Sequence, residues 1–380
     1  LSTDLYLATL PHLATYFDAS PALVQQTLSS FVIAFGTAQL VVGPLSDRFG
    51  RRPVLLAGFA IYFVASLACA LAPTIGVLIA GRFAQALGAC CTVLVARAVV
   101  RDANTPEEGA HILAKASSVL SAAPLLGPIL GSWLQVAFGW RAAFVALTAY
   151  SVAAGFAVWK LLGETNNHRD PHATHPAGLA RNYGGILRSS VFWSYAIPGA
   201  LSYGALFTFI SGSSFVLIRV LGVPTQHYGY CFAFGVTGYL SGTKMCRRLL
   251  ARVGVQRALR IGATIAAIGG TTFAALAVAG FDHWTTVIGA MFVVLMAHGI
   301  VFPCVQAGAV APFARQAGAA SGFLGFVVMA CAFPIGAWVG ASHDGTIRPL
   351  AFTVAALCLT LLASAIGLAR FRGRIGASIA

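Results

Sequence analysis

Charged residues are scarce in this chain, and acidic residues are the scarcest. Only 9% of its 380 residues are charged and ten are Asp or Glu, whereas a soluble domain has about 25% charged residues. Hydrophobic residues make up 58% of the chain and the mean hydropathy is +0.83. These values exclude a soluble globular domain and predict a polytopic protein embedded in a lipid bilayer.

The sequence also lacks the motifs of cysteine and metal chemistry. Its eight cysteines lie in or beside apolar segments and form no CxxC. This pattern excludes a disulfide framework and predicts reduced, buried thiols. A histidine-rich stretch between Gly163 and Ser190 offers metal ligands, but Pro and Gly surround it and no Cys or carboxylate cluster completes a site. We therefore favour a solvated linker over a metal site and expect no cofactor.

Motifs of catalysis and ion conduction are missing as well. There is no HExxH, no convincing Ser-His-Asp arrangement and no acidic metal site, so we do not expect an enzyme. Nor is there a filter-like loop or a ring of charge, which argues against a channel.

Long apolar runs, by contrast, fill most of the chain. Runs of spanning length occur at about 23–45, 53–72, 74–99, 111–136, 139–163, 190–219, 227–246, 257–280, 284–310, 317–341 and 348–369. A further apolar segment ends near Phe17. It is shorter than the about 20 residues that a span needs, so we expect part of this first helix to lie upstream. Together these segments predict twelve membrane helices.

Basic residues alternate between the two sides of the membrane. When the turn at 47–53 is placed in the cytoplasm, the other side keeps only Arg141, Arg219 and Arg348, and Arg82 lies inside the membrane. By the positive-inside rule, both termini are then cytoplasmic. The net charge of +14 therefore reflects topology, and we expect no nucleic-acid partner.

The longest polar connection divides the chain into two six-helix halves. We expect an N-terminal half at 1–163, a cytoplasmic linker at 164–189 and a C-terminal half at 190–380. Gly43-x-x-x-Asp47-Arg48 between spans two and three is echoed by Gly242-x-x-x-Cys246-Arg247 between spans eight and nine. Matching interruptions in two halves are typical of the working parts of transporters.

Three stretches carry distinctive motifs. The turn between spans two and three reads Gly43-Pro-Leu-Ser-Asp-Arg-Phe-Gly-Arg-Arg-Pro53, and its Gly-Pro and Arg-Arg-Pro pairs predict a hard reversal between neighbouring antiparallel helices. Span four contains Arg82-Phe-Ala-Gln-Ala-Leu-Gly88, and span five contains Ala123-Pro-Leu-Leu-Gly-Pro-Ile-Leu-Gly-Ser132.

These motifs resemble those of the major facilitator superfamily over essentially the whole chain. Ser2-Thr-Asp-Leu-Tyr-Leu7 in span one and Val99-Val-Arg-Asp102 after span four look like the Bcr/CflA group of drug:proton antiporters. The resemblance implies an all-α fold of twelve transmembrane helices in two pseudo-symmetric halves. It also implies a monomer in the bacterial inner membrane that exports small amphipathic drug-like molecules in exchange for protons. An exporter of a natural metabolite, such as a sugar, dipeptide or amino acid derivative, shares every one of these motifs and remains the alternative.

Two residues are candidates for proton coupling. Asp4 is the only acidic residue inside a spanning segment, where desolvation favours a carboxyl group that can gain and lose a proton. Arg82 is the only basic residue inside the membrane, and we expect it to pair with Asp4 directly, through water or through Gln85. The alternatives are a structural hydrogen bond for Asp4 near the membrane surface, and a snorkelling or helix-bracing role for Arg82.

The resemblance implies a latch at the cytoplasmic side that joins the two halves when the cavity opens outward. In it Asp47 would face the N-terminus of span eleven and an arginine would meet Asp102. The alternative is a pure topology signal with solvated charges. The candidate latch residues are Gly43, Asp47, Arg48, Gly50, Arg51, Arg52 and Asp102.

The remaining candidates line span five and the central cavity. In span five we expect small residues and prolines to permit close packing and a bend, namely Pro124, Gly127, Pro128 and Gly131. Candidates for the apolar substrate cavity are Tyr6, Gln39, Gln85, Phe207 and His298. His298 could instead be a hydrogen-bonded packing residue.

Overall fold

The structure is a computed structural model. It describes residues 2–105, 107–109, 111–112, 115–116, 122–166 and 169–372. Much of the first part of the span predicted at 111–136 therefore lies outside the described residues.

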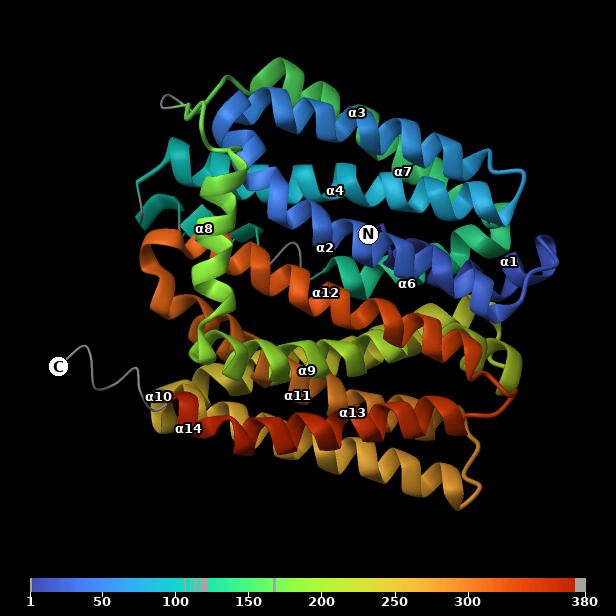
Figure 1. Cartoon of the computed structure of the whole chain (residues 1–380). Coiled ribbons are helices and arrows are strands. Elements are labelled where there is room, and N and C mark those ends of the chain that lie inside the picture. The colour runs from blue at the N-terminus through green and yellow to red at the C-terminus, as the bar shows by residue number, and fades with distance from the viewer. Residues whose placement is uncertain are drawn as a thin grey trace.

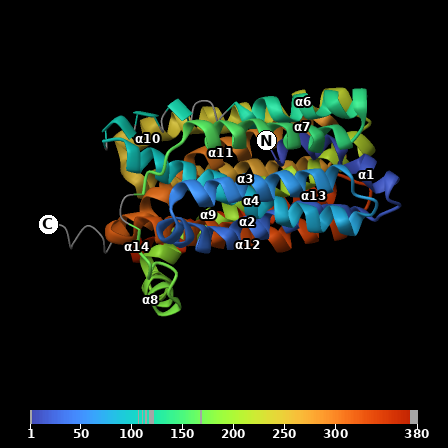
Figure 2. The ribbon, with the colours of Figure 1, turned by 90° about the horizontal axis from the view of Figure 1, so that it is seen from above.

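The described chain is a bundle of long antiparallel helices (Figures 1 and 2). Within the described part, nine helices are long and apolar enough to cross a membrane, and no strand occurs. The prediction of an all-α membrane protein is confirmed. The helices before the linker are η1 (Asp4–Thr9), α1 (Leu10–Tyr16), α2 (Pro21–Phe49), α3 (Arg51–Ala70), α4 (Ile75–Ala103), α6 (Ala123–Phe138) and α7 (Arg141–Leu161).

The second half repeats this pattern after a short helix, α8 (Pro176–Leu187), which lies across one end of the bundle (Figure 1). Its elements are α9 (Ser190–Ser214), the π-helical η2 (Phe215–Val220), α10 (Thr225–Val278), α11 (Trp284–Val310), η3 (Ala311–Gln316), α12 (Ala317–Ala341), α13 (Arg348–Gly367) and α14 (Ala369–Arg372). The element α10 is two helices, because Gly254 interrupts it with φ +73°. This break corresponds to the separate spans predicted at 227–246 and 257–280.

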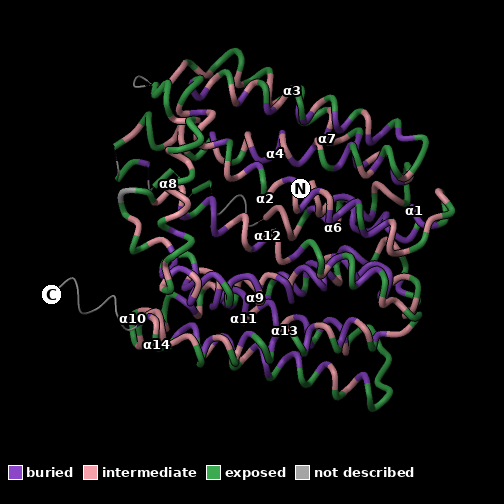
Figure 3. Tube along the Cα trace, in the orientation of Figure 1, coloured by how far each residue is buried: buried purple, intermediate pink, exposed green. Residues whose placement is uncertain are grey.

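We call the two ends of the bundle the basic end, with Gly50, the linker and α14, and the opposite end, with the loops at 17–20, 71–74, 279–283 and 342–347 (Figure 1). Helices α9 and α11 are mostly buried along their length, whereas α7 is mostly exposed (Figure 3). An exposed apolar helix is the arrangement that lipid permits.

The reversal between α2 and α3 differs from the predicted one. Gly43 and Pro44 do not end the helix, which continues to Phe49. The chain turns at Gly50 alone, with φ +101°, a conformation that side chains with a Cβ rarely adopt. Pro44 inside α2 cannot donate to the carbonyl of Leu40, and the Tyr183 hydroxyl of α8 donates to that carbonyl instead, at 2.8 Å.

Glycines bring the first segment of the chain against α6. A Cβ on Gly131 would lie 2.0 Å from the Leu5 carbonyl oxygen, and one on Gly127 would lie 2.7 Å from the Asp4 Cβ. Small residues at such positions let helix backbones approach closely in membranes. Asp4 is therefore positioned by its contact with α6.

The two halves meet along several helices. Gly229 of α10 packs on Pro128 and Ile129 of α6, where an added Cβ would lie 2.5 Å from their backbone. A Cβ on Gly36 of α2 would lie 2.7 Å from the Met329 Cβ of α12. Pro128 and Gly131 thus have packing roles, on α10 and on η1 respectively.

Two glycine substitutions test this packing. We expect Gly131→Ala to destabilise the protein by about 1–3 kcal/mol, because the backbone of η1 must move away from α6. Gly43→Ala is the control, since nothing lies within 4 Å of its added Cβ, and alanine favours a helix by about 1 kcal/mol. Thermal unfolding in detergent measures both, and equal melting temperatures for the two variants would contradict the close contact.

Candidate functional site

A buried arginine lies at the centre of the first half. Arg82 of α4 is 0% exposed. Its Nη1 donates to the Ser2 carbonyl oxygen at 2.9 Å and to the Gln85 side chain, and its Nε donates to the Thr27 carbonyl oxygen at 3.4 Å. Gln85 in turn donates to the Ser66 hydroxyl at 2.7 Å. Oxygen dipoles rather than a carboxylate therefore surround the guanidinium.

Aromatic rings complete this environment. The Arg82 guanidinium carbon lies 4.6 Å from the centre of the Tyr6 ring and 4.3 Å from that of Phe31. Such cation–π contacts stabilise a desolvated cation by about 2 kcal/mol. Tyr6 is itself fixed by a hydrogen bond to the Thr27 hydroxyl. The Arg82 charge is held in place, so the alternative of a snorkelling side chain is wrong.

The direct Arg82–Asp4 ion pair is not among the contacts of Arg82. The guanidinium reaches the chain two residues earlier, at Ser2, while Asp4 lies on Gly127. Tyr203 and Tyr228 of the second half lie within electrostatic range of Asp4. The structure thus brings Asp4 close to both halves and connects it to Arg82 through the backbone of Ser2.

The predicted cavity residues lie in different places. Phe207 is buried and stacks on Tyr203, with ring centres 6.3 Å apart. His298 is 5% exposed and its Nδ1 lies 2.9 Å from the Ser202 hydroxyl. This is the packing arrangement that the sequence left open for His298. Gln39 lies between α2 and α12, against Gly325.

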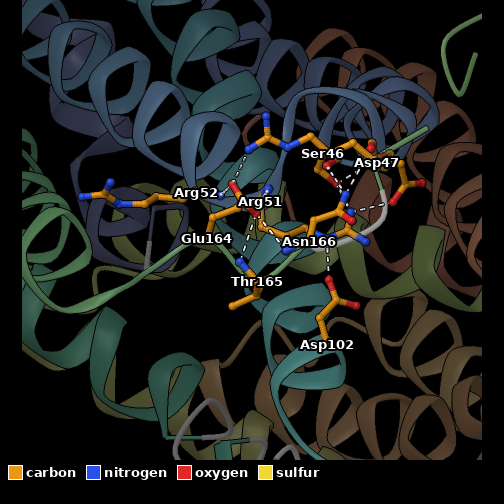
Figure 4. A network of polar contacts seen from close by, with 10 residues as sticks. Ser46, Asp47, Arg51, Arg52, Asp102, Glu164, Thr165 and Asn166 are labelled. Atoms are coloured by element: carbon orange, nitrogen blue, oxygen red, sulfur yellow. Dashed lines mark hydrogen bonds and ion pairs between the residues drawn. The ribbon is translucent and has the colours of Figure 1, made fainter. Parts of the chain in front are cut away.

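The basic end carries a charged cluster around the reversal at Gly50 (Figure 4). The Arg51 Nε donates to Asp102 at 2.7 Å, and its Nη1 donates to Asp47 and to the Ser46 hydroxyl at 2.6 Å each. Arg51 is buried, so these bonds form in a partly desolvated environment. One arginine therefore ties the ends of α2, α3 and α4 together.

The sequence analysis did not identify Glu164, which holds the other side of this turn. Its carboxylate accepts hydrogen bonds from the backbone N–H groups of Arg51, at 2.8 Å, and Arg52, at 3.3 Å. These are unpaired donors at the start of α3, where a negative charge is favourable. The sequence signal that could have identified Glu164 is the presence of a carboxylate directly after span six, close in space to the start of α3.

Hydrogen bonds set the charge state of Glu164. Partial burial raises the pKa of its carboxyl group, but the backbone N–H groups of Asn166, Arg51, Arg52 and Thr165 together hold the pKa below the ordinary value of 4.5. The carboxylate is thus ionised at neutral pH.

Among the described residues, no hydrogen bond or ion pair joins the Asp47 carboxylate to the N-terminus of α12. This carboxylate pairs with Arg51 four residues along the chain, as i,i+4 charges on a helix do. The linker contacts this turn instead: Asp170 donates its N–H to the Asp47 carbonyl oxygen at 3.2 Å, and Arg48 donates to the Thr174 hydroxyl at 2.6 Å.

The linker continues to the second half through α8. Tyr183, which donates to Leu40 of α2, also lies 5.9 Å, centre to centre, from the ring of Phe323 in α12. Gln316 of η3 and Asn182 of α8 lie within 3.4 Å. The linker therefore bridges α2 and α12 at the basic end.

The bundle and its turn motif define a membrane transporter, and comparison with known families gives the same class. The model of the Major Facilitator Superfamily matches residues 1–337, so the chain belongs to this superfamily. Its fold is the twelve-helix major facilitator fold. The chain is similar in structure to a D-xylose–proton symporter (TM-score 0.73, 14% identity, 95% of this chain and 93% of the other). It is also similar to a bacterial homolog of the human transporter Spinster, in an inward-facing conformation (TM-score 0.67, 16% identity, 98% and 92%).

Relatives in sequence have more specific names. The chain is 27% identical to a bicyclomycin resistance protein homolog of Haemophilus influenzae, over 93% of this chain and 88% of the relative. It is 29% identical to a chloramphenicol resistance protein of Pseudomonas aeruginosa (97% and 86%). It is 27% identical to the multidrug resistance protein MdtL of Escherichia coli (89% and 84%).

Removing the Tyr183 hydroxyl tests the bridge by α8. In Tyr183→Phe the Leu40 carbonyl oxygen loses its donor, which costs about 1–3 kcal/mol for a buried group. We expect a lower melting temperature in detergent. Tyr150→Phe is the control because Tyr150 is exposed on α7, and a similar loss in that variant would count against the bridge.

The Glu164 site predicts a pH dependence. A carboxyl group with a depressed pKa stabilises the fold above its unfolded pKa, and that stabilisation is lost as the pH falls through the folded value. Glu164→Gln should therefore lower the melting temperature at pH 7, and its difference from the parent should shrink below pH 4.5. Glu107→Gln, at an exposed position, is the control. A difference that stays constant from pH 7 to pH 3.5 would contradict an ionised cap.

Proposed function

We propose that this chain is a proton-coupled exporter of small amphipathic drug-like molecules in a bacterial inner membrane. It carries out no enzymatic reaction, uses the proton gradient in place of a cofactor and works as a monomer. The drug resistance names of its relatives support the substrate class. The basic end faces the cytoplasm in this proposal, supported by the positive-inside rule, and the opposite end faces outward.

The observation that carries the coupling is the position of Asp4. It is the acidic residue of the first helical turn, packed on Gly127 of α6. A carboxyl group within the membrane costs roughly 2.5–3.5 kcal/mol when ionised, so its protonation depends on what lies nearby. Tyr203 and Tyr228 of the second half lie within electrostatic range of Asp4, so both halves contribute to the surroundings of its carboxyl group.

Arg82 provides a fixed positive charge beside this acid. Its Nη2 has no hydrogen-bond acceptor among the described residues. We assign that donor to a hydrogen bond with a polar group of the substrate. The aromatic rings around Arg82 would contact the apolar part of the substrate. Substrate and proton then compete through the charge of Asp4, which is the requirement of exchange.

Alternating access needs two units that rock against each other. We assign these to residues 1–163 and 190–380, with residues 164–189 as the connection between them. The close contacts of α2 with α12 and of α6 with α10 are the surfaces along which the units would move, in the way of packed helices that slide or rotate in domain closure.

Reconstituted protein tests the coupling. In proteoliposomes with an internal pH dye and an imposed proton gradient, bicyclomycin or chloramphenicol should drive proton movement by the parent protein. Asp4→Asn should reduce this movement at least tenfold (about 1.4 kcal/mol or more in coupling), since an amide cannot carry the proton. Asp282→Asn, at an exposed loop position, is the control.

The outcomes separate the alternatives. Proton movement with a sugar, a dipeptide or an amino acid derivative, but with no drug, would replace the drug substrate by a natural metabolite. Normal coupling in Asp4→Asn would show that Asp4 has a structural role and would overturn the coupling mechanism.

A further inference from the structure

An arginine joins the two halves at the opposite end. The Arg219 Nη2, on η2 of the second half, donates to the Pro11 carbonyl oxygen of α1 at 2.6 Å and to the Thr15 hydroxyl. Beside this contact, the His12 Nε2 lies 3.2 Å from the Thr225 hydroxyl of α10. The end of α1 is thereby held by two elements of the second half.

A second histidine lies within electrostatic range of Arg219. His343 follows α12, and its ring centre is 5.8 Å from that of Phe215 at the start of η2. Burial lowers the pKa of His343, the neighbouring Asp344 raises it and Arg219 lowers it, with a net decrease. Arg219 also acts electrostatically on His12.

The charges around this contact do not neutralise it. Among the described residues, no carboxylate forms an ion pair with Arg219, and the Asp344 carboxylate accepts hydrogen bonds from Thr346. In the described part of the chain, the other acidic, basic and histidine side chains at this end, none of which forms a hydrogen bond or ion pair with Arg219, are Asp18 after α1, Arg141 of α7, His227 of α10, Asp282 and His283 before α11, and Arg348 of α13. A proton added to His12 or His343 therefore places a second positive charge next to Arg219.

We propose that His12 and His343 form a proton-binding latch with Arg219, which keeps the opposite end closed while both imidazoles are neutral and releases it when they are protonated. His12 lies on the first half and Arg219 on the second, so repulsion between them acts directly on the contact between the halves. His343 lies on the second half and adds its charge beside Arg219. This proposal rests on the proposed function for its orientation, with the latch exposed to protons outside the cell.

The direction of the pH effect follows from linkage. A closed state that disfavours the protonated imidazole is stable above the ordinary histidine pKa of 6.5, and closure weakens as the external pH falls below it. An acidic exterior then favours opening toward the side from which protons enter. This adds a proton site separate from Asp4 and further along the first span, since η1 precedes α1.

Site-directed labelling tests the latch. Ser211 is buried beside this end, and its carbonyl oxygen accepts a bond from Gln25 across the two halves. A Ser211→Cys variant, with the eight native cysteines replaced, is treated with a membrane-impermeant maleimide in right-side-out vesicles. The interior is held at pH 7.5 and the exterior is varied from pH 7.5 to 5.5. Asp282→Cys, in an exposed loop at the same end, corrects for the pH dependence of the thiol reaction.

The corrected rate should rise about tenfold at pH 5.5, as one pKa unit of linkage predicts. The rise should be lost when His12→Gln and His343→Gln are combined, and should persist in His227→Gln as the control. Arg219→Gln should give a high rate at every pH. A pH response that survives in the double variant, or a flat response in the parent, would overturn the latch.

The same samples separate this latch from the proposed function. Labelling of Asp282→Cys only from the vesicle interior would overturn the orientation, and with it the sensing of external protons. A normal pH response in a protein that moves no drug and no protons in proteoliposomes would leave the latch in place and overturn the exporter.

Discussion

The peptide groups of a membrane helix have no water to bind, so each carbonyl that loses its helical partner needs another donor. Pro44 and Pro198, each inside a helix, create this need near the basic end. Pro44 frees the Leu40 carbonyl, which the Tyr183 hydroxyl satisfies. Pro198 frees the Ser194 carbonyl, which the Arg372 guanidinium satisfies at 3.0 Å from its Nε.

These two bonds explain why short peripheral segments are held against the bundle. The linker helix α8 and the terminal helix α14 are too short to be stable alone. Each supplies one long polar side chain that donates to a carbonyl freed by a proline. Tyr183 of α8 donates to α2, and Arg372 of α14 donates to α9. A hydrogen-bonding deficit created by a proline thus determines where the connections lie.

Much of this arrangement followed from the sequence. Hydropathy predicted the spans, because the length of an apolar run can be read directly from consecutive residues. The contact of an arginine with Asp102 followed from the family resemblance, and Arg51 makes it. The predicted end of α2 was wrong. Gly-Pro indicates a helix end in water, whereas at this position a hydroxyl group distant in sequence donates to the carbonyl that the proline leaves free. Glu164 was not predicted, because its partners are the backbone N–H groups of Arg51 and Arg52, and backbone groups leave no side-chain pattern in the sequence. The surroundings of Arg82 were predicted only in part. Charge counting favoured a carboxylate partner, because carbonyl dipoles and aromatic rings carry no net charge to count.

Different kinds of polar interaction hold the helices together at the two ends of the molecule, and this difference matters for a transporter. At the basic end, Arg51 has two carboxylates and a hydroxyl, and Glu164 has four backbone donors, so the charges of Arg51 and Glu164 are both compensated. This cluster lies mainly within the first half. At the opposite end, Arg219 bonds to neutral oxygens of the other half, and no ion pair with a described residue fixes it. Hydrogen bonds from a charged guanidinium to neutral oxygens are worth about 1.5–3 kcal/mol each, which is the range that a proton or a substrate can shift. The opposite end is therefore the side on which a small change in charge can separate the halves.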